Sequence, residues 1–239
     1  LAIDQGQLLL HYQPQVDLVS GAVIGVEALV RWQHPEQGLI APARFIEIAE
    51  KSALIDKLGA WVLNEAFRQL SVWLASGRPI QQMSINISAE QFRRSDLVAL
   101  VQERLQHYHL PAQLIMLEIT EGALIQDNAR VLQVLTELER LQVRLSIDDF
   151  GTGYSSLAYL RRFPIHELKI DRSFIDEVTE NGDDQAITRT ILSMASCLNL
   201  STVAEGVETR AQAELLASFH CPVGQGYFFA KPMPADQVA

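Results

Sequence analysis

The chain has 239 residues, 48% of them hydrophobic and 20% charged, and its formal net charge is −10. This composition is typical of a soluble globular enzyme, and the excess of Asp and Glu argues against binding polymeric nucleic acid through its phosphates. A small anionic ligand is still compatible with this charge if metal ions supply positive charge locally. No apolar run is long enough to span a bilayer, so we expect no membrane contact by this domain.

The start of the chain predicts a fragment. The first residue is not Met, so we expect residues 1–239 to be a single domain excised from a longer multidomain protein. The opening residues also lack the basic and apolar regions of a signal peptide. Two cysteines, Cys197 and Cys221, are too few for a disulfide framework and suit small core residues in a reducing compartment. We therefore expect a cytoplasmic domain, whether or not its parent protein is anchored to a membrane.

The first third of the chain begins with two predicted strands. They cover residues 8–18 and 22–32 and are joined by a turn that contains Gly21. So short a link favours an antiparallel pair, because a parallel crossover needs a dozen or more residues. Pro42 then begins a short predicted helix, and a longer helix over 56–75 follows with a broad apolar face.

Strands and helices alternate through the rest of the chain. The apolar patterns predict strands over 83–88, 114–119, 143–149, 167–170, 201–205 and 222–225, and helices over 90–108, 128–141, 155–162, 184–198 and 209–219. Ser88 with Gln91 and Thr209 with Gln212 are predicted capping boxes at two helix starts. Eight strands, most followed by a helix, favour an α/β fold: a modified TIM-type (βα)8 barrel whose first strand is antiparallel to the rest.

Residues 145–154 are the most informative stretch for function. A short apolar strand ends on Asp148 and Asp149 and leads into the turn Gly151-Thr152-Gly153. Enzymes of the α/β class commonly present metal ligands in this way. A lone Asp-Asp pair more often forms a turn or a helix cap, but similar polar residues recur at the other strand ends.

The polar residues that close the strands are Glu27, Asn86, Glu118, Asp148, Asp149, Lys169, Glu205 and Gln225. In a barrel these ends converge on one face. Carboxylate and amide oxygens suit Mg²⁺ or Mn²⁺ and suit zinc poorly. Asp148 could bridge two such ions, which would clamp the attacking and leaving oxygens of a phosphoester. Lys169 could orient a nucleophilic water or neutralise phosphate charge.

Four further residues give weaker signals. Glu121 and Glu208 each follow a site glutamate by three residues and read either as supports of the site or as carboxylates in the first turn of a helix. Gly151 and Gly153 match no nucleotide-binding fingerprint, so we interpret them as loop flexibility.

The motifs in combination identify a family. They are Glu27-Ala28-Leu29-Val30-Arg31, Ser84-Ile85-Asn86-Ile87-Ser88, Leu117-Glu118-Ile119-Thr120-Glu121, Asp148-Asp149-Phe150-Gly151, Leu168-Lys169-Ile170-Asp171, Ala204-Glu205-Gly206-Val207-Glu208 and Gly224-Gln225-Gly226. The chain resembles the EAL domain family, phosphodiesterases that hydrolyse the bacterial second messenger cyclic di-GMP. The resemblance extends over nearly the whole chain, from Tyr12 to Pro232.

The resemblance implies roles for these residues. It places one Mg²⁺ or Mn²⁺ ion on Glu27, Asn86, Glu118 and Asp148 and a second on Asp148, Asp149 and Glu205. It makes Lys169 and Glu205 the candidates for activating the water, and which of them is the base stays open. Glu121 would support catalysis by steadying the Asp149 loop, which couples the site to a dimer interface. The dinucleotide would lie along Gln13, Leu29, Arg31, Asp171 and Gln225, and the product would be linear 5′-pGpG.

The resemblance also implies partners and a rival function. A homodimer is expected, together with GGDEF or sensor domains in the parent chain. Some members of the family have lost metal ligands and act only as cyclic di-GMP receptors, but every ligand position here matches the active pattern, which predicts an enzyme. A barrel glycosidase using two of the glutamates is a second rival, and the aromatic content of 7% makes a sugar cleft a weaker interpretation.

Overall fold

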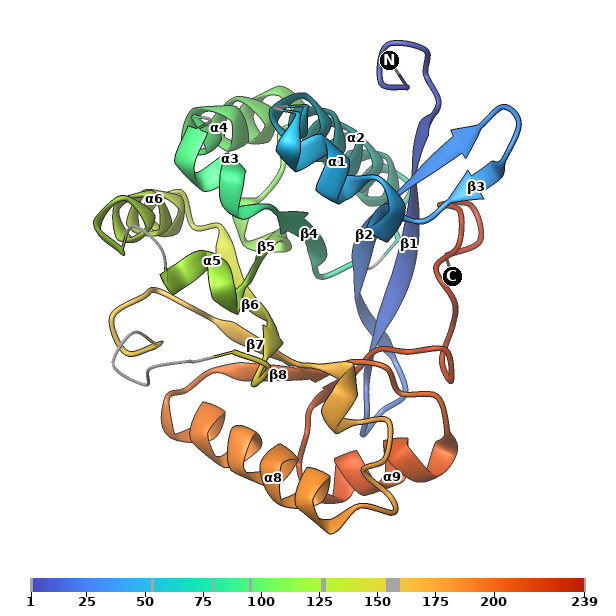
Figure 1. The fold of residues 1–239 in the computed structure, drawn as a ribbon, viewed down its shortest axis with the longest axis vertical. Coiled ribbons are helices and arrows are strands. Elements are labelled where there is room, and N and C mark those ends of the chain that lie inside the picture. Colours follow the sequence, from blue (N-terminus) through green and yellow to red (C-terminus); the bar gives the residue numbers. More distant parts are fainter. Residues whose placement is uncertain are drawn as a thin grey trace.

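The structure, a computed structural model, describes residues 2–52, 54–78, 80–94, 96–125, 128–153 and 160–238. Within these ranges nine strands form one sheet in the order β1-β9-β8-β7-β6-β5-β4-β2-β3, and pairing of β1 with β2 closes it into a barrel (Figure 1). The strands are β1 (Leu8–Asp17), β2 (Val23–His34), β3 (Gly38–Ile40), β4 (Met83–Ile87), β5 (Ile115–Thr120), β6 (Arg144–Phe150), β7 (Glu167–Ile170), β8 (Ser201–Ala204) and β9 (Val223–Gly224).

The pairing confirms the predicted barrel and the reversed first strand. β1 is antiparallel to both of its neighbours, β2 and β9. Every other pair around the barrel is parallel, from β2–β4 through β8–β9. β3 lies outside the ring as an antiparallel partner of β2. The carboxyl ends of seven strands in the described part of the chain therefore face one end of the barrel.

Helices flank the barrel on opposite sides (Figure 1). They are α1 (Ile46–Lys51), α2 (Ile55–Ala75), α3 (Ala89–Arg94), α4 (Leu97–Tyr108), α5 (Glu121–Ile125), α6 (Asn128–Arg140), α8 (Gly182–Cys197) and α9 (Arg210–Ser218), with short 3-10 helices at η1 (Pro42–Arg44), η2 (Ala112–Leu114) and η3 (Arg172–Phe174). Among the described helices, none has both the length and the apolar character needed to cross a membrane.

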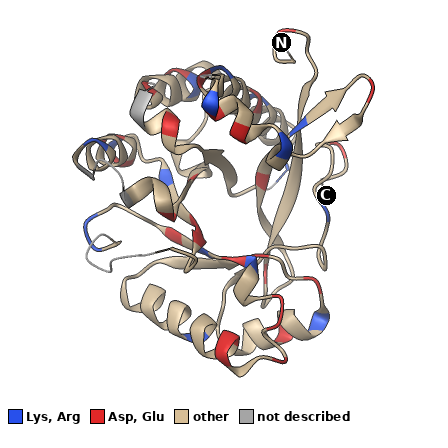
Figure 2. Ribbon diagram, viewed as in Figure 1, with Lys and Arg blue, Asp and Glu red and all other residues tan. Residues whose placement is uncertain are grey.

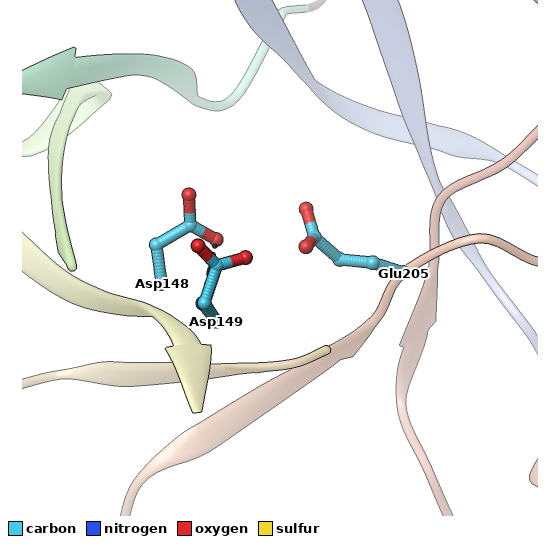
Figure 3. Close-up of side chains that lie close together, drawn as sticks. All are labelled: Asp148, Asp149 and Glu205. Carbon is cyan, nitrogen blue, oxygen red and sulfur yellow. Dashed lines mark hydrogen bonds between the residues drawn. The ribbon is translucent and has the colours of Figure 1, made fainter. Parts of the chain in front are cut away.

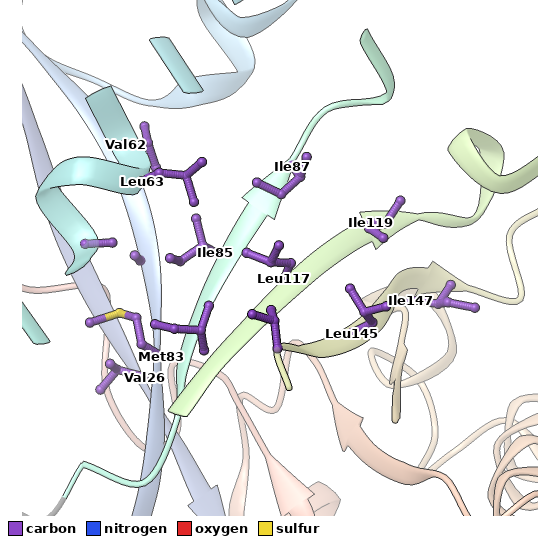
Figure 4. Close-up of a cluster of buried hydrophobic side chains, with 14 of the residues drawn as sticks. Val26, Val62, Leu63, Met83, Ile85, Ile87, Leu117, Ile119, Leu145 and Ile147 are labelled. Carbon is purple, nitrogen blue, oxygen red and sulfur yellow. The ribbon is translucent and has the colours of Figure 1, made fainter. Parts of the chain in front are cut away.

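The barrel wall separates an apolar layer from a polar interior. Side chains alternate between the two faces of a strand, so on β5 Leu117 and Ile119 point toward the helices while Glu118 points toward the barrel axis. Leu63 of α2 packs with Ile85 of β4 in this outer layer, and both are fully buried (Figure 4). The same alternation on each strand places polar groups inside the barrel.

Several local predictions need correction. The helix predicted over 90–108 is two helices, α3 and α4, because Asp96 caps a new start by accepting a hydrogen bond from the Ala99 nitrogen at 3.2 Å. β3 and the short helix α5 were not predicted, since neither is long enough to show a period. Cys221 is buried as predicted, but the prediction was wrong for Cys197, which is exposed at the end of α8. The helix predicted over 155–162 falls mainly outside the described residues.

Candidate active site

A buried lysine lies at the centre of the polar residues inside the barrel. The Nζ atom of Lys169, on β7, is 2.7 Å from Glu205 Oε1 and 2.8 Å from Glu118 Oε2. It is also 3.2 Å from Asp148 Oδ1 and 3.5 Å from Glu27 Oε2. The parallel register brings these groups to one level of the barrel, and the lysine is 0% exposed. Acidic positions also occur on the outer helices (Figure 2).

A break in strand regularity brings two adjacent aspartates together. The β6–β7 register shifts between Ile147 and Phe150, and Asp149 has a left-handed φ of 54°. In an unbroken strand Asp148 and Asp149 would point to opposite faces, but a bulge removes that alternation. Oxygens of Asp148, Asp149 and Glu205 all lie within 4.8 Å of one another (Figure 3). Asp149 thus joins the same cluster as Asp148.

Amide side chains hold both oxygens of Glu27. Asn86 Nδ2 donates to Glu27 Oε1 at 2.6 Å, and Gln225 Nε2 donates to Glu27 Oε2 at 2.5 Å. The same Gln225 nitrogen donates to Gln13 Oε1 at 3.1 Å. Glu27, Gln13 and Gln225 are buried, whereas Asn86 is exposed at the end of β4. Four residues predicted from separate parts of the chain therefore share one hydrogen-bonded group.

The cluster has more negative than positive charge. Burial raises the pKa of Glu118 well above its usual value, and burial raises that of Glu205 to about 8, with Asp148 and Glu27 adding to the rise and Lys169 opposing it. Burial alone would lower the pKa of Lys169, but the surrounding carboxylates outweigh it and raise that pKa well above normal. Within the described residues, four carboxylates share this one ammonium group, so the cluster favours added positive charge.

The donor atoms fit a hard divalent cation. Oε1 of Glu118 is buried and has no hydrogen-bond partner among the described residues, although its other oxygen accepts a hydrogen bond from Lys169. A buried acceptor without a partner is costly, and a bound cation would satisfy it. The carboxylates of Asp148, Asp149 and Glu205 add further oxygen donors nearby. Such a set suits Mg²⁺ or Mn²⁺ better than zinc.

Glu121 contacts the loop that follows the two aspartates. It begins α5, is buried, and accepts a hydrogen bond from the Gly151 nitrogen at 3.2 Å through Oε2. Gly151 has a φ of 101°, which favours glycine, and a Cβ at Gly153 would lie 2.6 Å from Glu121 Oε1. Backbone conformation at Gly151 and close packing at Gly153 therefore explain why glycine occupies both positions, in addition to the predicted loop flexibility.

The remaining predicted residues lie around this centre. Asp171 lies close to Asp149. The pKa of Asp149 rises to about 6, mainly because of desolvation and further because of the negative charges of Asp148 and Asp171. Arg31 is half-buried and donates to the Val30 carbonyl at 2.9 Å. Glu208 is exposed and forms an ion pair with Arg172 at 3.0 Å.

Two cavities adjoin the centre and meet at Leu29. A polar one of 270 Å³ is lined by Gln13, Glu27, Leu29, Arg172, Glu205, Gly206, Glu208, Gln225, Gly226 and Tyr227. An apolar one of 330 Å³ lies between β2, β4, α1 and α2, and Leu29 and Asn86 line it together with side chains such as Ile46 and Leu58. Arg31 and Asp171 are not among the residues that line either cavity.

The sequence interpretation missed Arg172 and Tyr227 in the polar cavity. Each follows a strand-end motif directly, Arg172 after Lys169-Ile170-Asp171 and Tyr227 after Gly224-Gln225-Gly226. Their position just beyond a barrel strand was the available signal.

Comparison with known proteins finds relatives that match nearly the whole chain. Residues 1–232 match the model of the EAL domain. The bifunctional diguanylate cyclase/cyclic di-GMP phosphodiesterase MucR of Pseudomonas aeruginosa is 47% identical over 237 residues, which cover 99% of this chain and 35% of that protein. The cyclic di-GMP phosphodiesterase NbdA of the same organism is 46% identical over 233 residues, 98% of this chain and 30% of its own length.

A solved structure agrees closely with the fold. The complex of the PaMucR phosphodiesterase with c-di-GMP superposes with a TM-score of 0.96 at 47% identity, covering 100% of this chain and 96% of the other. This chain spans about a third of the length of the curated relatives that it matches. With the family match over residues 1–232, these similarities establish that the chain belongs to the EAL domain family.

Proposed function

We propose that the chain is a metal-dependent phosphodiesterase that hydrolyses cyclic di-GMP to linear 5′-pGpG. The observation that carries the proposal is the cluster in which Lys169 Nζ lies within 3.5 Å of four carboxylates at the carboxyl ends of the strands. The names of MucR and NbdA and the c-di-GMP complex of PaMucR support the choice of substrate. The excess of carboxylates over an acid–base pair supports phosphoester chemistry over glycoside hydrolysis.

The metal ligands are proposed as two sets that share Asp148. Glu27, Asn86, Glu118 and Asp148 would hold one Mg²⁺ or Mn²⁺ ion, and Asp148, Asp149 and Glu205 the second. These ions would supply positive charge to the phosphodiester oxygens and lower the pKa of a nucleophilic water. The unpartnered Glu118 oxygen supports the first set, and the grouping of three carboxylates supports the second.

Lys169 and Glu205 would have different roles in the proton transfers of the reaction. A water oxygen forms a bond to phosphorus, the bond from phosphorus to the 3′ oxygen breaks, and the 3′ oxygen takes up one proton in balance with the one that the water loses. Lys169 keeps its proton because the carboxylates around it raise its pKa, so its ammonium orients the water and offsets phosphate charge. Glu205 reaches the polar cavity and is therefore the better acceptor for the water proton.

The shape of the site supports a ligand with two bases. Leu29 lines both the polar cavity and the apolar cavity, and we propose that one dinucleotide crossing the barrel end places a base in each. Arg172 adds a guanidinium group to the polar cavity, where it suits a phosphate oxygen or the edge of guanine. Gln13 and Gln225 bring amide groups to the same wall, and Arg31 and Asp171 would contact the ligand from beyond the lining.

The decisive experiment is to incubate the purified chain with cyclic di-GMP and Mg²⁺ or Mn²⁺ and to separate the nucleotides by chromatography. We expect pGpG to appear only with metal and to be abolished by EDTA. Glu27→Ala and Asp148→Asn should lower turnover by roughly a hundredfold or more while circular dichroism stays unchanged. Binding of the dinucleotide without product would establish a receptor in place of the enzyme, and wild-type rates in both variants would overturn the metal assignment.

Assembly is part of the proposal. We expect a homodimer, as well as GGDEF or sensor domains in the parent chain, and the bifunctional name of MucR supports the second expectation. Sedimentation of the chain with and without cyclic di-GMP tests the dimer, and a monomer in both conditions would contradict it.

A further inference from the structure

A row of buried side-chain amides runs through the barrel interior and ends on Glu27. Arg144 Nη1 donates to Gln82 Oε1 at 2.8 Å, and Gln82 Nε2 donates to Gln15 Oε1 at 3.3 Å. Gln15 Nε2 donates to Gln225 Oε1 at 3.1 Å, and Gln225 Nε2 donates to Glu27 Oε2 at 2.5 Å. The three glutamines, 8%, 1% and 4% exposed, are buried throughout. We call Arg144, Gln82, Gln15, Gln225 and Glu27 the amide chain.

The two ends of the amide chain fix the direction of every amide within it. A guanidinium group can only donate hydrogen bonds, so Gln82 must turn its oxygen toward Arg144. An ionised carboxylate can only accept, so Gln225 must turn its nitrogen toward Glu27. If the Gln15 amide were reversed, its nitrogen would face the Gln82 nitrogen, and its oxygen would face the Gln225 oxygen. Neither contact could then form a hydrogen bond. The chemistry of Arg144 and Glu27 therefore sets the orientation of all three amides between them.

The backbone leaves space for the central member. The β1–β2 register places Gly25 opposite Gln15, and a Cβ at Gly25 would lie 2.9 Å from Gln15 Oε1. The hydroxyl of Ser84 accepts from both Gln15 and Gln82 at 3.4 Å, which ties the amides to β4. The glycine on β2 and the serine on β4 thus form a cradle for the Gln15 amide.

We propose that Gln15 and Gln82 are positioning residues for Glu27, acting through Gln225; this inference rests on the proposed metal-dependent function. If Gln15 cannot donate, the Gln225 oxygen loses its partner, and the amide is held only through its nitrogen, by Gln13 and Glu27. The charge-assisted hydrogen bond from Gln225 to Glu27 Oε2 is then less firmly oriented, because one of the contacts that position its donor is missing. A ligand carboxylate that is less firmly oriented binds a divalent cation more weakly.

The test is a double-substitution cycle read out as Mn²⁺ binding, measured from the electron paramagnetic resonance signal of free Mn²⁺ without substrate. Gln15→Met should raise the Mn²⁺ dissociation constant roughly tenfold or more. Gln82→Met should raise it less, and the double variant should match Gln15→Met, because both substitutions interrupt one chain. Gln69→Met, the same change at a buried glutamine of α2 outside the amide chain, should leave binding at the wild-type value.

Two outcomes would overturn the inference: a dissociation constant within twofold of wild type in folded Gln15→Met, or effects of the two substitutions that simply add. If Gln15→Met does not fold, Gly25→Ala replaces it, since it leaves Gln15 in place but crowds its oxygen.

A second readout separates this inference from the proposed function. In the protein without added metal, Gln82→Met should move the side-chain amide resonances of Gln225, two links away, while Gln69→Met should not. If the wild type neither binds Mn²⁺ nor makes pGpG, the proposed function fails, but these resonances still decide whether the amide chain exists. Unchanged Gln225 resonances would refute it.

Discussion

Lys169 is a buried ammonium group that cannot neutralise all the carboxylates around it. Its Nζ atom lies within 3.5 Å of Glu27, Glu118, Asp148 and Glu205, and the side chain has no contact with solvent. Removing one partner of a buried ionic group leaves the others without compensation, which costs more than losing a surface pair. Replacing Lys169 should therefore affect stability and, under the proposed mechanism, turnover.

Lys169→Met should lower the free energy of unfolding by about 3–5 kcal/mol without divalent cations. Addition of Mn²⁺ should recover part of that loss, since a ligand that binds only the folded state stabilises it. The same variant should lose turnover more than affinity for cyclic di-GMP, because its charge acts on the water and the phosphate. Urea unfolding, isothermal titration and a turnover assay measure the three effects. A variant that loses only ligand affinity would contradict this role.

The surroundings of His166 predict a pH dependence of folding stability that does not involve the active site. Its Nδ1 atom accepts a hydrogen bond from the Leu145 nitrogen at 3.2 Å, and desolvation, together with the charge of Arg144, lowers its pKa below 6.5. The unfolded chain therefore takes up the proton first as pH falls. The contribution of neutral His166 to folding stability is complete above pH 6.5. It declines as the pH falls from 6.5 toward the lowered pKa that His166 has in the folded state.

Comparing the wild type with His166→Gln isolates this contribution from other groups that titrate in the same range. Between pH 7.5 and 5.5, the wild type should lose more unfolding free energy in urea than the variant does. Equal losses in the two proteins would show that His166 does not contribute.

The start of α9 depends on a complete capping box. The Gln212 nitrogen donates to Thr209 Oγ1 at 3.2 Å, and the Thr209 nitrogen donates to Gln212 Oε1 at 2.9 Å. Gln212 Nε2 also donates to the Ile175 carbonyl at 3.0 Å, so the box attaches the helix to the segment after β7. The cap therefore positions the Glu205–Glu208 loop, which precedes it.

Thr209→Ala should lower the unfolding free energy by about 1 kcal/mol through loss of the cap. Thr190→Ala is the matched control, because that exposed hydroxyl donates a hydrogen bond within α8, to the Ala186 carbonyl at 2.7 Å. Thermal unfolding of both variants gives the comparison. A control as destabilised as Thr209→Ala would remove the case for the cap.

At the scale of the whole molecule, the segment of residues 232–238 pairs with the first strand, β1, through Met233. Tyr12 and Met233 exchange backbone hydrogen bonds of 2.7 and 3.0 Å. Val238 is 1% exposed, and Arg78 donates to its carbonyl and to that of Ala235. These contacts lie beside β1, the strand that closes the barrel.

Truncation after Lys231 should therefore lower the unfolding free energy by about 2–4 kcal/mol, from lost hydrogen bonds and one buried valine. Gln237→Ala, at an exposed position of the same segment, should have little effect. Urea unfolding distinguishes them, and a truncated chain as stable as the full one would show that barrel closure does not need this segment.

The sequence predicted the strands well because each is a short apolar run that ends on a polar residue. The strand over 167–170 agrees with β7, and both predicted capping boxes form, at Ser88 with Gln91 and at Thr209 with Gln212. Prediction failed where the signal was local geometry. The break between α3 and α4 follows from the Asp96 cap, which an uninterrupted apolar stripe concealed.

The sequence alone also predicted which strand-end residues would lie together, because polar residues at the ends of barrel strands converge. Glu27, Asn86, Glu118, Asp148, Lys169, Glu205 and Gln225 do lie together, and their roles in metal binding and catalysis stay predictions. Only the tertiary structure decided that Lys169 is central, that a bulge turns Asp149 into the cluster, and that Gln15 and Gln82 reach Glu27 through Gln225. The physical reason is that one-dimensional patterns specify which face a side chain takes. Register, bulges and the direction of hydrogen bonds are set by neighbouring strands far away in sequence.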